Sequence, residues 1–413
     1  MGLFIEAKRP YANLEGPYKM KYINQVDLSG KTVFIRCDFN VPLDENSNIT
    51  DDTRIRRALP TILYAIDNGA KVVLASHLGR PHGKRDPSLS LLPVAKRLAT
   101  LLRRPVEFID RCVGDDVEKR VAEMKPGQVA LLENLRFHIE EENDSEEFAR
   151  EMLKLFDVYV NDAFGVSHRK HASVHMLPKL APIAVAGFLM KEELETFKKV
   201  METNNRPFVA VVGGAKVSGK LGCLKNLLDK TDKILIGGAQ AFTFLKALGY
   251  PVGKSLVEDH LMPAALEIME LAKKKGVKLY LPVDFVCSTG IDDITNRVTA
   301  TYQEIPEDKM GLDIGPATCQ LFKEALADAK TVLWNGPMGV FEVKAFSNGT
   351  KAVAQAIGES KAFSFVGGGD TAKAVRRVGE KQNMSYISTG GGASLELLEG
   401  KVLPAIAVLE EKS

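Results

Sequence analysis

The stretch FVAVVGGAKVSGKLG, from Phe208 to Gly222, opens with five apolar residues that are followed by two glycines and then by two lysines. A continuous apolar run that ends in glycine is typical of a strand buried on both faces of a parallel sheet. The same kind of run recurs along the chain. In the first half the runs are KTVFIRCDFN, KVVLASH, QVALLEN and VYVNDAF, and in the second they are FVAVVGG, KILIGG, LYLPVDFV, TVLWNG, FSFVGGG and SYISTGGG.

Amphipathic stretches of helical length lie between these runs, for example residues 54–68, 91–102, 261–274 and 344–357. Buried strands that alternate with helices predict an α/β fold in which helices cover both faces of parallel sheets. The chain has 413 residues, and a single hydrophobic core rarely grows past roughly 250–300 residues. We therefore predict two doubly wound, Rossmann-like parallel-sheet domains.

The boundary between the domains is expected at a charged helical stretch. This stretch, MKEELETFKKVMETNN, runs from Met190 to Asn205 and is soon followed by Pro207. A long polar helix between two sheets would act as a connector, although an ordinary surface helix inside one domain is the alternative. The prediction is an N-terminal domain of residues 1–189 and a C-terminal domain of residues 190–399, joined by a connecting helix and a hinge.

Composition and charge narrow the class of protein. The chain is 45% hydrophobic and 26% charged, and its net charge of +2 argues against nucleic-acid binding by bulk electrostatics. Its apolar runs fall short of the roughly 18–20 residues needed to cross a bilayer. The five cysteines are far apart and form no C-x-x-C motif, which favours free thiols in a reducing compartment. We expect a cytoplasmic protein that binds neither membranes nor nucleic acid, with residues 1–19 as an extension.

Cationic side chains stand at the strand ends of the first half. In open α/β sheets, ligands collect at the carboxyl ends of the strands. The residues at these ends are Arg36, Asp38, Asn40, His77, Arg80, Arg136, His168, Arg169 and His171. If the fold brings them together, they form a cationic bowl for a small phosphorylated or carboxylated ligand. The alternatives are solvated surface charges for the arginines and metal binding for the histidines, whose spacing does not favour a metal site.

Glycines replace the cations at the strand ends of the second half. They are Gly213, Gly214, Gly237, Gly238, Gly311, Gly336, Gly367, Gly368, Gly369, Gly390, Gly391 and Gly392. Glycine lets a flat ligand or a phosphate approach the backbone, and a helix that starts just afterwards offers free N–H groups to an anion. Glycines that serve only tight turns are the alternative.

The run FSFVGGGDTAKAV is the sharpest of these cases, because Asp370 or Thr371 could cap the next helix and contact a metal ion. It also fits the G-x-G-x-x-A pattern of dinucleotide-binding dehydrogenases. That pattern requires an acidic residue about 20 positions later, and the next strand end supplies only Ser388 and Thr389. A dehydrogenase is therefore the weaker interpretation.

The GGAKVSGKLG segment nearly matches a P-loop. Counted from Gly214 it gives G-x-x-x-x-G-K, but Leu221 stands where the motif needs a hydroxyl for Mg²⁺. Lys216 and Lys220 are four residues apart and would share one face if a helix begins here. Two adjacent ammonium groups repel each other unless an anion lies between them. The segment thus predicts either a phosphate site of another kind or two solvated lysines.

The chain resembles the phosphoglycerate kinase family. The resemblance runs in order from about Met20 to the C-terminus. Its motifs are RCDFNVP, SHLGRP, LLENLRF, YVNDAFG, GGAKVSGK, LPVDF, LDIGP, WNGPMGVFE, GGGDT and STGGGASLELLEGKVLP. The family is a two-lobed α/β kinase without a P-loop. It implies a hydroxy-acid substrate on the N-terminal lobe and Mg-nucleotide on the C-terminal lobe.

The resemblance also implies roles for individual residues. Those implied to hold 3-phosphoglycerate or 1,3-bisphosphoglycerate are Asp38, Asn40, Arg36, Arg54, His77, Arg80, Arg136 and Arg169. Those implied to hold ADP or ATP are Gly214, Lys216, Lys220, Gly238, Gly311, Leu312, Asn335, Glu342, Gly369, Asp370 and Thr371. In this set Gly311 and Leu312 line the adenine slot, Glu342 takes the ribose hydroxyls and Asp370 engages Mg²⁺. Those implied to be catalytic are Arg54, Lys216, Lys220, Gly367, Gly368 and Gly369.

The implied reaction is the reversible, Mg-dependent transfer of a phosphoryl group between 1,3-bisphosphoglycerate and ADP, which gives 3-phosphoglycerate and ATP in glycolysis and gluconeogenesis. The resemblance further implies a monomer, hinges near residues 190–205 and at Ser388 and Thr389, and a C-terminal tail of about residues 400–413 that packs on the N-terminal domain. A non-catalytic nucleotide-binding scaffold and a nicotinamide-dependent dehydrogenase are the alternatives.

Overall fold

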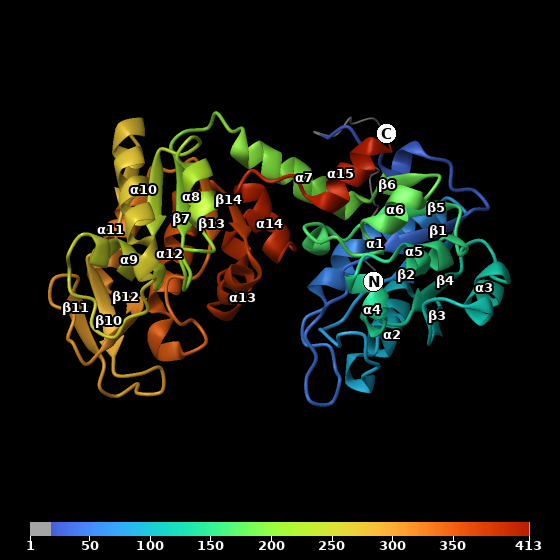
Figure 1. Cartoon of the computed structure of the whole chain (residues 1–413), viewed down its shortest axis with the longest axis horizontal. Coiled ribbons are helices and arrows are strands. Elements are labelled where there is room, and N and C mark those ends of the chain that lie inside the picture. Colours follow the sequence, from blue (N-terminus) through green and yellow to red (C-terminus); the bar gives the residue numbers. More distant parts are fainter. Residues whose placement is uncertain (1–17, 413) are drawn as a thin grey trace, which may run out of the picture. The chain divides into compact units, whose positions relative to one another are not determined.

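The computed structural model describes residues 18–412, which separate into two compact units. The first unit runs up to Glu195 and takes in the chain again from Leu403, and the second is Thr196–Val402. The division therefore lies inside helix α7 (Phe188–Met201), a few residues after the expected boundary. Most of the extension expected for residues 1–19 lies outside the described residues. Figure 1 labels the elements of both units.

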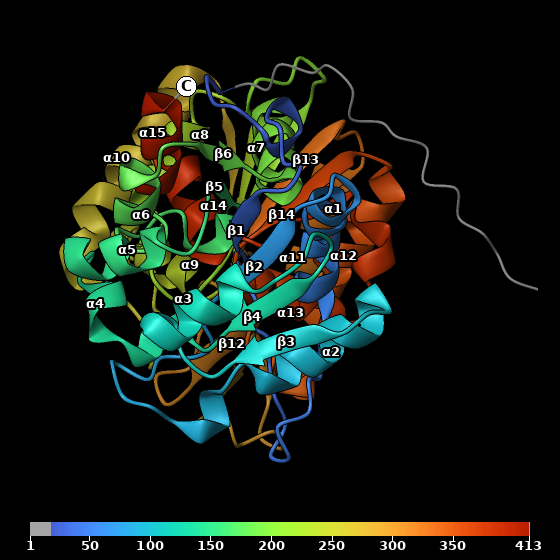
Figure 2. The same ribbon diagram turned by 90° about the vertical axis from the view of Figure 1, so that its right-hand side faces the viewer.

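The first unit is built on a six-stranded parallel sheet with the order β3-β4-β2-β1-β5-β6. Its strands are β1 (Thr32–Arg36), β2 (Lys71–Ala75), β3 (Val106–Ile109), β4 (Val129–Leu132), β5 (Val158–Asn161) and β6 (Ala184–Ala186). Arg36 is in register with Ala75 on one side and with Asn161 on the other, so neighbouring strands end level. This alignment brings the residues that follow β1, β2 and β5 to one edge of the sheet. Figure 2 shows strands of this sheet as broad arrows.

Helices surround this sheet. They are α1 (Thr53–Asp67), α2 (Leu92–Leu102), α3 (Asp115–Ala122), α4 (Ile139–Glu142), α5 (Glu146–Leu153), α6 (Met176–Leu180), the first part of α7, and α15 (Pro404–Glu411). Short 3-10 turns are Ile23–Gln25, Pro87–Leu89, Leu135–Phe137 and Phe164–Val166. Val33 and Ile35 of β1 face a core shared with α1 and α2, whereas Phe34 faces the other way and stacks on Tyr159. Both faces of the sheet are thus buried, which explains the continuous apolar runs.

The C-terminal helix α15 belongs to the first unit. It contacts α6 and β6, and Lys412 donates a hydrogen bond of 3.0 Å from its amino group to the carbonyl oxygen of Ala181. Glu410 of the same helix accepts one from the backbone N–H of Lys19 at 3.2 Å. The last residues therefore return to the unit in which the chain began.

The second unit contains another six-stranded parallel sheet, with the order β15-β14-β13-β7-β8-β9. Its strands are β7 (Phe208–Val212), β8 (Lys233–Ile236), β9 (Lys278–Tyr280), β13 (Thr331–Asn335), β14 (Phe363–Gly367) and β15 (Tyr386–Ile387). Asn335 is in register with Val212 and with Gly367, so three central strands end together. The two parallel sheets confirm the predicted fold class.

A three-stranded antiparallel sheet in the second unit was not expected from the sequence. It has the order β11-β10-β12 and is formed by β10 (Asp284–Ser288), β11 (Val298–Thr301) and β12 (Met310–Ile314). The run LYLPVDFV, expected as one strand, is split between β9 and β10, with Pro282 between them. Gly311 was expected at a strand end, and this was wrong: it is the second residue of β12.

The helices of the second unit complete its layers. They are the last part of α7, α8 (Leu221–Leu227), α9 (Gln240–Ala247), α10 (Met262–Lys275), α11 (Pro316–Leu326), α12 (Asn348–Ser360), α13 (Gly369–Arg377) and α14 (Gly391–Leu398). Short 3-10 turns are Asp259–Leu261, Lys344–Phe346 and Lys381–Asn383. The buried Trp334 of β13 packs in a core with α11 and α12. Over residues 18–412, the helices lack the length and apolar character that a membrane span needs.

Candidate functional site

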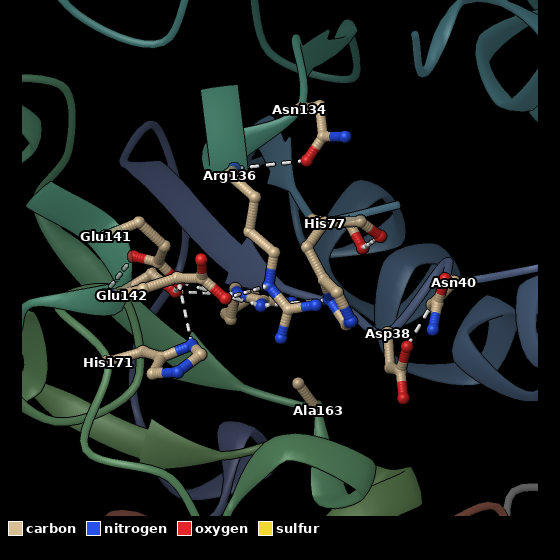
Figure 3. Close-up of polar contacts among 12 residues, drawn as sticks. Asp38, Asn40, His77, Asn134, Arg136, Glu141, Glu142, Ala163 and His171 are labelled. Carbon is tan, nitrogen blue, oxygen red and sulfur yellow. Dashed lines mark hydrogen bonds and ion pairs between the residues drawn. The ribbon is translucent and has the colours of Figure 1, made fainter. Parts of the chain in front are cut away.

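The cationic residues of the first unit gather at the carboxyl edge of its sheet. Figure 3 shows Arg136 extending between His77 and Glu142, with His171 and Asp38 at the sides. These side chains come from segments that follow β1, β2, β4 and β5. The structure thus brings together residues that lie far apart in the sequence.

Arg36 lies beneath this group and is fully buried. Its Nε donates to Ser173 Oγ at 2.8 Å, one Nη donates to the carbonyl oxygen of Cys37, and the other lies 3.3 Å from His77 Nδ1. That second Nη is also 3.9 Å from Glu141 Oε1. Arg36 was predicted to bind substrate; its guanidinium has no exposed surface, so we assign it to the support of the site from within.

Arg136 is held by the loop that follows β2. Its Nη1 donates to the carbonyl oxygen of Gly79 at 2.7 Å, and its Nε lies 3.5 Å from Glu142 Oε1. Asn134 fixes the same loop, because its amide donates to the carbonyl oxygens of Leu78 and Leu89 at 2.7 and 2.9 Å. The sequence reasoning missed Asn134, although an asparagine just past the end of a strand is a common turn-forming signal.

The other predicted contacts lie closer to solvent. Arg54 donates to Asp38 Oδ2 at 2.6 Å and keeps 30% of its side chain exposed. Asn40 Oδ1 accepts the backbone N–H of Gly79 at 2.9 Å, which ties the ends of β1 and β2 together. Arg80 is exposed and Arg169 is half-buried, so both can reach a ligand at the rim.

Burial and neighbouring positive charge lower the pKa values of several side chains in this group. Burial, followed by the charge of Arg136, lowers the pKa of His77 well below its usual value, and the same two causes lower that of His171 to about 3. Burial and the nearby Arg169 lower the pKa of His168 to about 4. Burial and Arg36 also lower the pKa of Arg136, to about 10. Positive charge that disfavours protonation of neighbouring side chains in a partly buried site forms an environment that an anion stabilises.

The second unit contains a pocket of about 490 Å³ at the strand ends of its sheet. Among its lining residues are the predicted nucleotide contacts Gly214, Gly238, Gly311, Leu312, Glu342 and Asp370. Phe242 and Phe285, which sequence reasoning missed, also line it, and their ring centroids are 4.5 Å apart. A Cβ on Gly311 would collide with the ring of Phe242, so glycine keeps this wall flat.

Other glycines at this edge allow backbone segments to touch. Gly238 has a φ of +69°, and a Cβ on it would collide with the carbonyl oxygen of Gly214. Gly336 has a φ of +104°, and a Cβ on it would collide with the carbonyl oxygen of Gly213. These glycines therefore serve backbone packing. Gly369, at the start of α13, differs: a Cβ on it would meet no described atom within 4 Å, so the space beside its Cα is open.

Lys216 and Lys220 do not share a helix face, contrary to the expectation. Helix α8 begins only at Leu221, with Lys220 as its N-cap residue, and Lys216 is exposed in the preceding turn. The amino group of Lys220 donates to Asn335 Oδ1 at the end of β13, and burial lowers its pKa. Only Lys220 is therefore drawn toward the strand ends.

Asp370 and Thr371 have different surroundings in the first turn of α13. Thr371 is buried, and its hydroxyl accepts the backbone N–H of Gly336 at 2.7 Å, so it supports the loop after β13. Asp370 is 76% exposed and lies 3.8 Å from Lys373. Within residues 18–412, His, Cys, Asp and Glu form no cluster that could hold a metal ion by itself. A cation bound here would be coordinated by the carboxylate of Asp370 together with oxygens of a ligand, as Mg²⁺ often is.

Comparison with known proteins decides the family. A family model described as phosphoglycerate kinase matches residues 23–401. The chain belongs to the phosphoglycerate kinase family. It is 58% identical to phosphoglycerate kinase of Geobacter metallireducens and 57% identical to that of Geotalea uraniireducens, in each case over 393 residues. These alignments cover 95% of this chain and 99% and 98% of the two relatives.

Solved structures of phosphoglycerate kinases share the fold. The enzyme from Coxiella burnetii has a TM-score of 0.84 and 43% identity, covering 95% of this chain and 99% of its own. The enzyme from Pyrococcus horikoshii has a TM-score of 0.82 and 33% identity, covering 95% and 100%. The predicted family and phosphotransferase activity are thus confirmed, and the chain is an enzyme of glycolysis rather than a dehydrogenase or an inactive scaffold.

Proposed function

We propose that the first unit binds 3-phosphoglycerate or 1,3-bisphosphoglycerate in its cationic site and that the second unit binds ADP or ATP in the pocket at its sheet edge. The observation that carries the first assignment is the convergence of Arg136, His77 and His171 at one edge of the sheet (Figure 3), where burial and the charge of Arg136 keep the pKa of both imidazoles low. Arg54, Arg80 and Arg169 have enough exposure to contact the phosphate and carboxylate of such a substrate.

The nucleotide assignment rests on the shape and chemistry of the pocket. Gly311, Leu312 and the aromatic ring of Phe242 offer a flat apolar wall that suits a base, and Glu342 at the same pocket can accept hydrogen bonds from ribose hydroxyls. The free backbone N–H groups at the start of α13, near Gly369, suit the phosphates.

A magnesium ion fits the exposed carboxylate of Asp370. A bound Mg²⁺ would neutralise charge on the nucleotide phosphates. Lys220 approaches the same region, since Asp370 is one of the charges that act on its pKa. We assign Lys220 and the 367–369 backbone to the transferring phosphoryl group, and Lys216 to nucleotide phosphates from the exposed turn.

Phosphoryl transfer to 3-phosphoglycerate needs no general base, because the acceptor is a carboxylate. Its oxygen attacks the γ-phosphorus of ATP while the bond from that phosphorus to the β,γ-bridging oxygen breaks, and ADP leaves. What the reaction requires is in-line positioning and positive charge near the equatorial oxygens, which Lys220 and Arg54 can supply.

The two substrates are assigned to different units, so the reaction requires an arrangement of the units that holds both substrates within bonding distance and excludes water. We assign the hinges to α7 and to the region of Ser388 and Thr389, and we infer a monomeric cytoplasmic enzyme. Analytical ultracentrifugation of the protein with and without both substrates measures the oligomeric state and any compaction together.

A coupled assay with ATP, Mg²⁺ and 3-phosphoglycerate tests the proposal. We expect turnover that depends on all three, and separate binding of each substrate by calorimetry. A protein that binds Mg-ATP yet shows no turnover with 3-phosphoglycerate would contradict it.

A further inference from the structure

We propose that Glu141 is a positioning residue for the phosphoglycerate site. From beneath the site, its carboxylate fixes the 168–173 segment, which supplies Arg169 and His171, and joins this segment to Arg36. The inference rests on the proposed function of the first unit and deepens it, since it names a residue that the sequence reasoning did not single out.

Glu141 binds the end of the 168–173 segment through both carboxylate oxygens. It lies in α4 and is fully buried. Its Oε1 accepts the hydroxyl of Ser173 at 2.6 Å, and its Oε2 accepts the backbone N–H of Ser173 at 2.8 Å. Its own carbonyl oxygen accepts the backbone N–H of Ala172 at 2.8 Å. Three hydrogen bonds therefore hold the segment to one short helix.

Ser173 connects Glu141 to other residues around the site through its own hydrogen bonds. Its hydroxyl oxygen also accepts from Arg36 Nε at 2.8 Å, and its carbonyl oxygen accepts the hydroxyl of Tyr159 at 2.7 Å. Arg36 in turn lies 3.3 Å from His77 Nδ1. A change in the position of Ser173 would thus reach His77 through Arg36.

The charge of Glu141 matters as well as its hydrogen bonds. Its Oε1 lies 3.9 Å from Arg36 and 4.0 Å from His171 Nδ1. Figure 3 shows Glu141 beside His171. Burial raises the pKa of Glu141, whereas Arg36 and the hydrogen bonds from Ser173 oppose that rise. Arg36 has no exposed surface, and a buried cation that loses its counter-charge is strongly unfavourable. The carboxylate of Glu141 therefore places negative charge next to Arg36 on the buried side of the site.

Two neighbouring glutamates separate this role from a general effect of α4. Glu142 lies 3.5 Å from Arg136 Nε and belongs to the site itself. Glu140 is exposed on the same helix and is not among the charges that shift the pKa of Arg136, whereas Glu141 is. The change Glu140→Gln is therefore a matched control for Glu141→Gln.

The experiment measures the binding of 3-phosphoglycerate and of Mg-ADP by calorimetry for the full chain and for Glu141→Gln, Glu141→Asp and Glu140→Gln. For Glu141→Gln we expect the Kd of 3-phosphoglycerate to rise roughly tenfold, as for the loss of one charge-assisted hydrogen bond, and that of Mg-ADP to stay unchanged. Glu141→Asp, which keeps the charge, should recover part of the loss, and Glu140→Gln should behave like the unaltered chain.

The outcomes separate the inference from the function on which it rests. If the unaltered chain does not bind 3-phosphoglycerate, the proposed function fails. If it binds and Glu141→Gln binds equally well, or loses affinity for both ligands alike, the positioning role is overturned. Should Glu141→Gln not fold, Ser173→Ala tests the same link, because it removes only the hydroxyl between Glu141 and Arg36. Unchanged 3-phosphoglycerate affinity in Ser173→Ala would likewise overturn the role.

Discussion

The amino group of Lys220 donates a hydrogen bond to the side-chain oxygen of Asn335. Lys220 occupies the N-cap position of α8 and Asn335 is the last residue of β13, so the bond joins two strand-end segments of one sheet. The amide nitrogen of Asn335 is buried and has no hydrogen-bond partner within the described residues. A lysine drawn inward beside an unsatisfied amide donor places two hydrogen-bond donors at this edge, which suits the phosphate site that we propose here.

The first prediction concerns this pair. Lys220→Ala should lower kcat by roughly 10²–10³-fold, because a cation at the moving phosphoryl group acts mainly in the transition state. The fold should remain intact, as seen by circular dichroism. Lys225→Ala is the matched control, since Lys225 lies in the same helix and pairs with Glu267 at 2.9 Å on the surface. Near-normal kcat in Lys220→Ala would remove the lysine from the reaction.

A second prediction tests the P-loop interpretation of the same segment. Leu221→Ser supplies the hydroxyl that a P-loop needs, yet we expect no gain in Mg-nucleotide affinity, because the chain belongs to the phosphoglycerate kinase family and we assign the magnesium ion to Asp370. Leu221 is only half-buried, so the loss of stability should be about 1 kcal/mol. Nucleotide titration and urea unfolding measure the two effects. Tighter binding of Mg-ATP by the variant would revive the P-loop interpretation.

The third prediction concerns Arg54, which donates to Asp38 at 2.6 Å. Arg54→Ala should lower kcat on the order of 10²-fold while nucleotide affinity stays the same, because Arg54 is assigned to the substrate and the transferring phosphoryl group. Arg56→Ala is the control, since Arg56 pairs with Asp52 on the exposed side of the same helix. Steady-state kinetics with both substrates saturating decides the matter, and an unchanged kcat would exclude Arg54 from the site.

The fourth prediction concerns pH. The pKa of His171 in the folded protein is about 3, whereas that of an unfolded histidine is about 6.5. Between these values the unfolded chain binds the extra proton, so the stabilising contribution is complete above about pH 6.5 and is lost as the pH falls toward the folded value. The urea midpoint of the first unit should therefore fall between pH 7 and pH 5.

His171→Gln should reduce this fall, and His260→Gln, at an exposed position, should not. The measurement is urea unfolding at the two pH values, followed by a probe within residues 18–195. An equal pH dependence in His171→Gln and the unaltered chain would contradict the assignment.

The fifth prediction concerns magnesium. Asp370→Asn should raise the Mg²⁺ concentration needed for half-maximal activity, because an amide is a weaker ligand than a carboxylate for a hard cation. Binding of 3-phosphoglycerate in the absence of nucleotide should be unaffected. Asp229→Asn, at a surface carboxylate that pairs with Lys275, provides the comparison. The same Mg²⁺ requirement in all three proteins would show that Asp370 does not engage the ion.

The sequence alone determined the fold class and the edges at which ligands could bind. Strand β7 consists of consecutive apolar residues because both faces of the parallel sheet are covered. Such a pattern involves only residues that are adjacent in the sequence, so it can be recognised without the structure. The residues directly after such a strand must lie at the carboxyl edge of the sheet. For this reason the positions of Arg136, Gly238 and Asp370 could be predicted without coordinates.

What the side chains do at those edges could not be read in the same way. Arg36 and Ser173 are 137 residues apart and meet at 2.8 Å, and Glu141 and Ser173 are 32 apart. Such contacts depend on how whole elements pack, because sequence periodicity reports only near neighbours along a strand or helix. Arg36 therefore looked like a ligand contact in the sequence and became a buried support in the fold.

Tertiary structure also separated residues that the sequence made look alike. Lys216 and Lys220 have the same spacing as a helix pair, but the turn before α8 leaves one exposed and directs the other to Asn335. Gly311 resembled the strand-end glycines, yet it lies inside an antiparallel strand against Phe242. In both cases the surroundings of the residue depend on a contact with a distant segment. Such contacts arise when the whole chain packs, and a local sequence pattern does not report them.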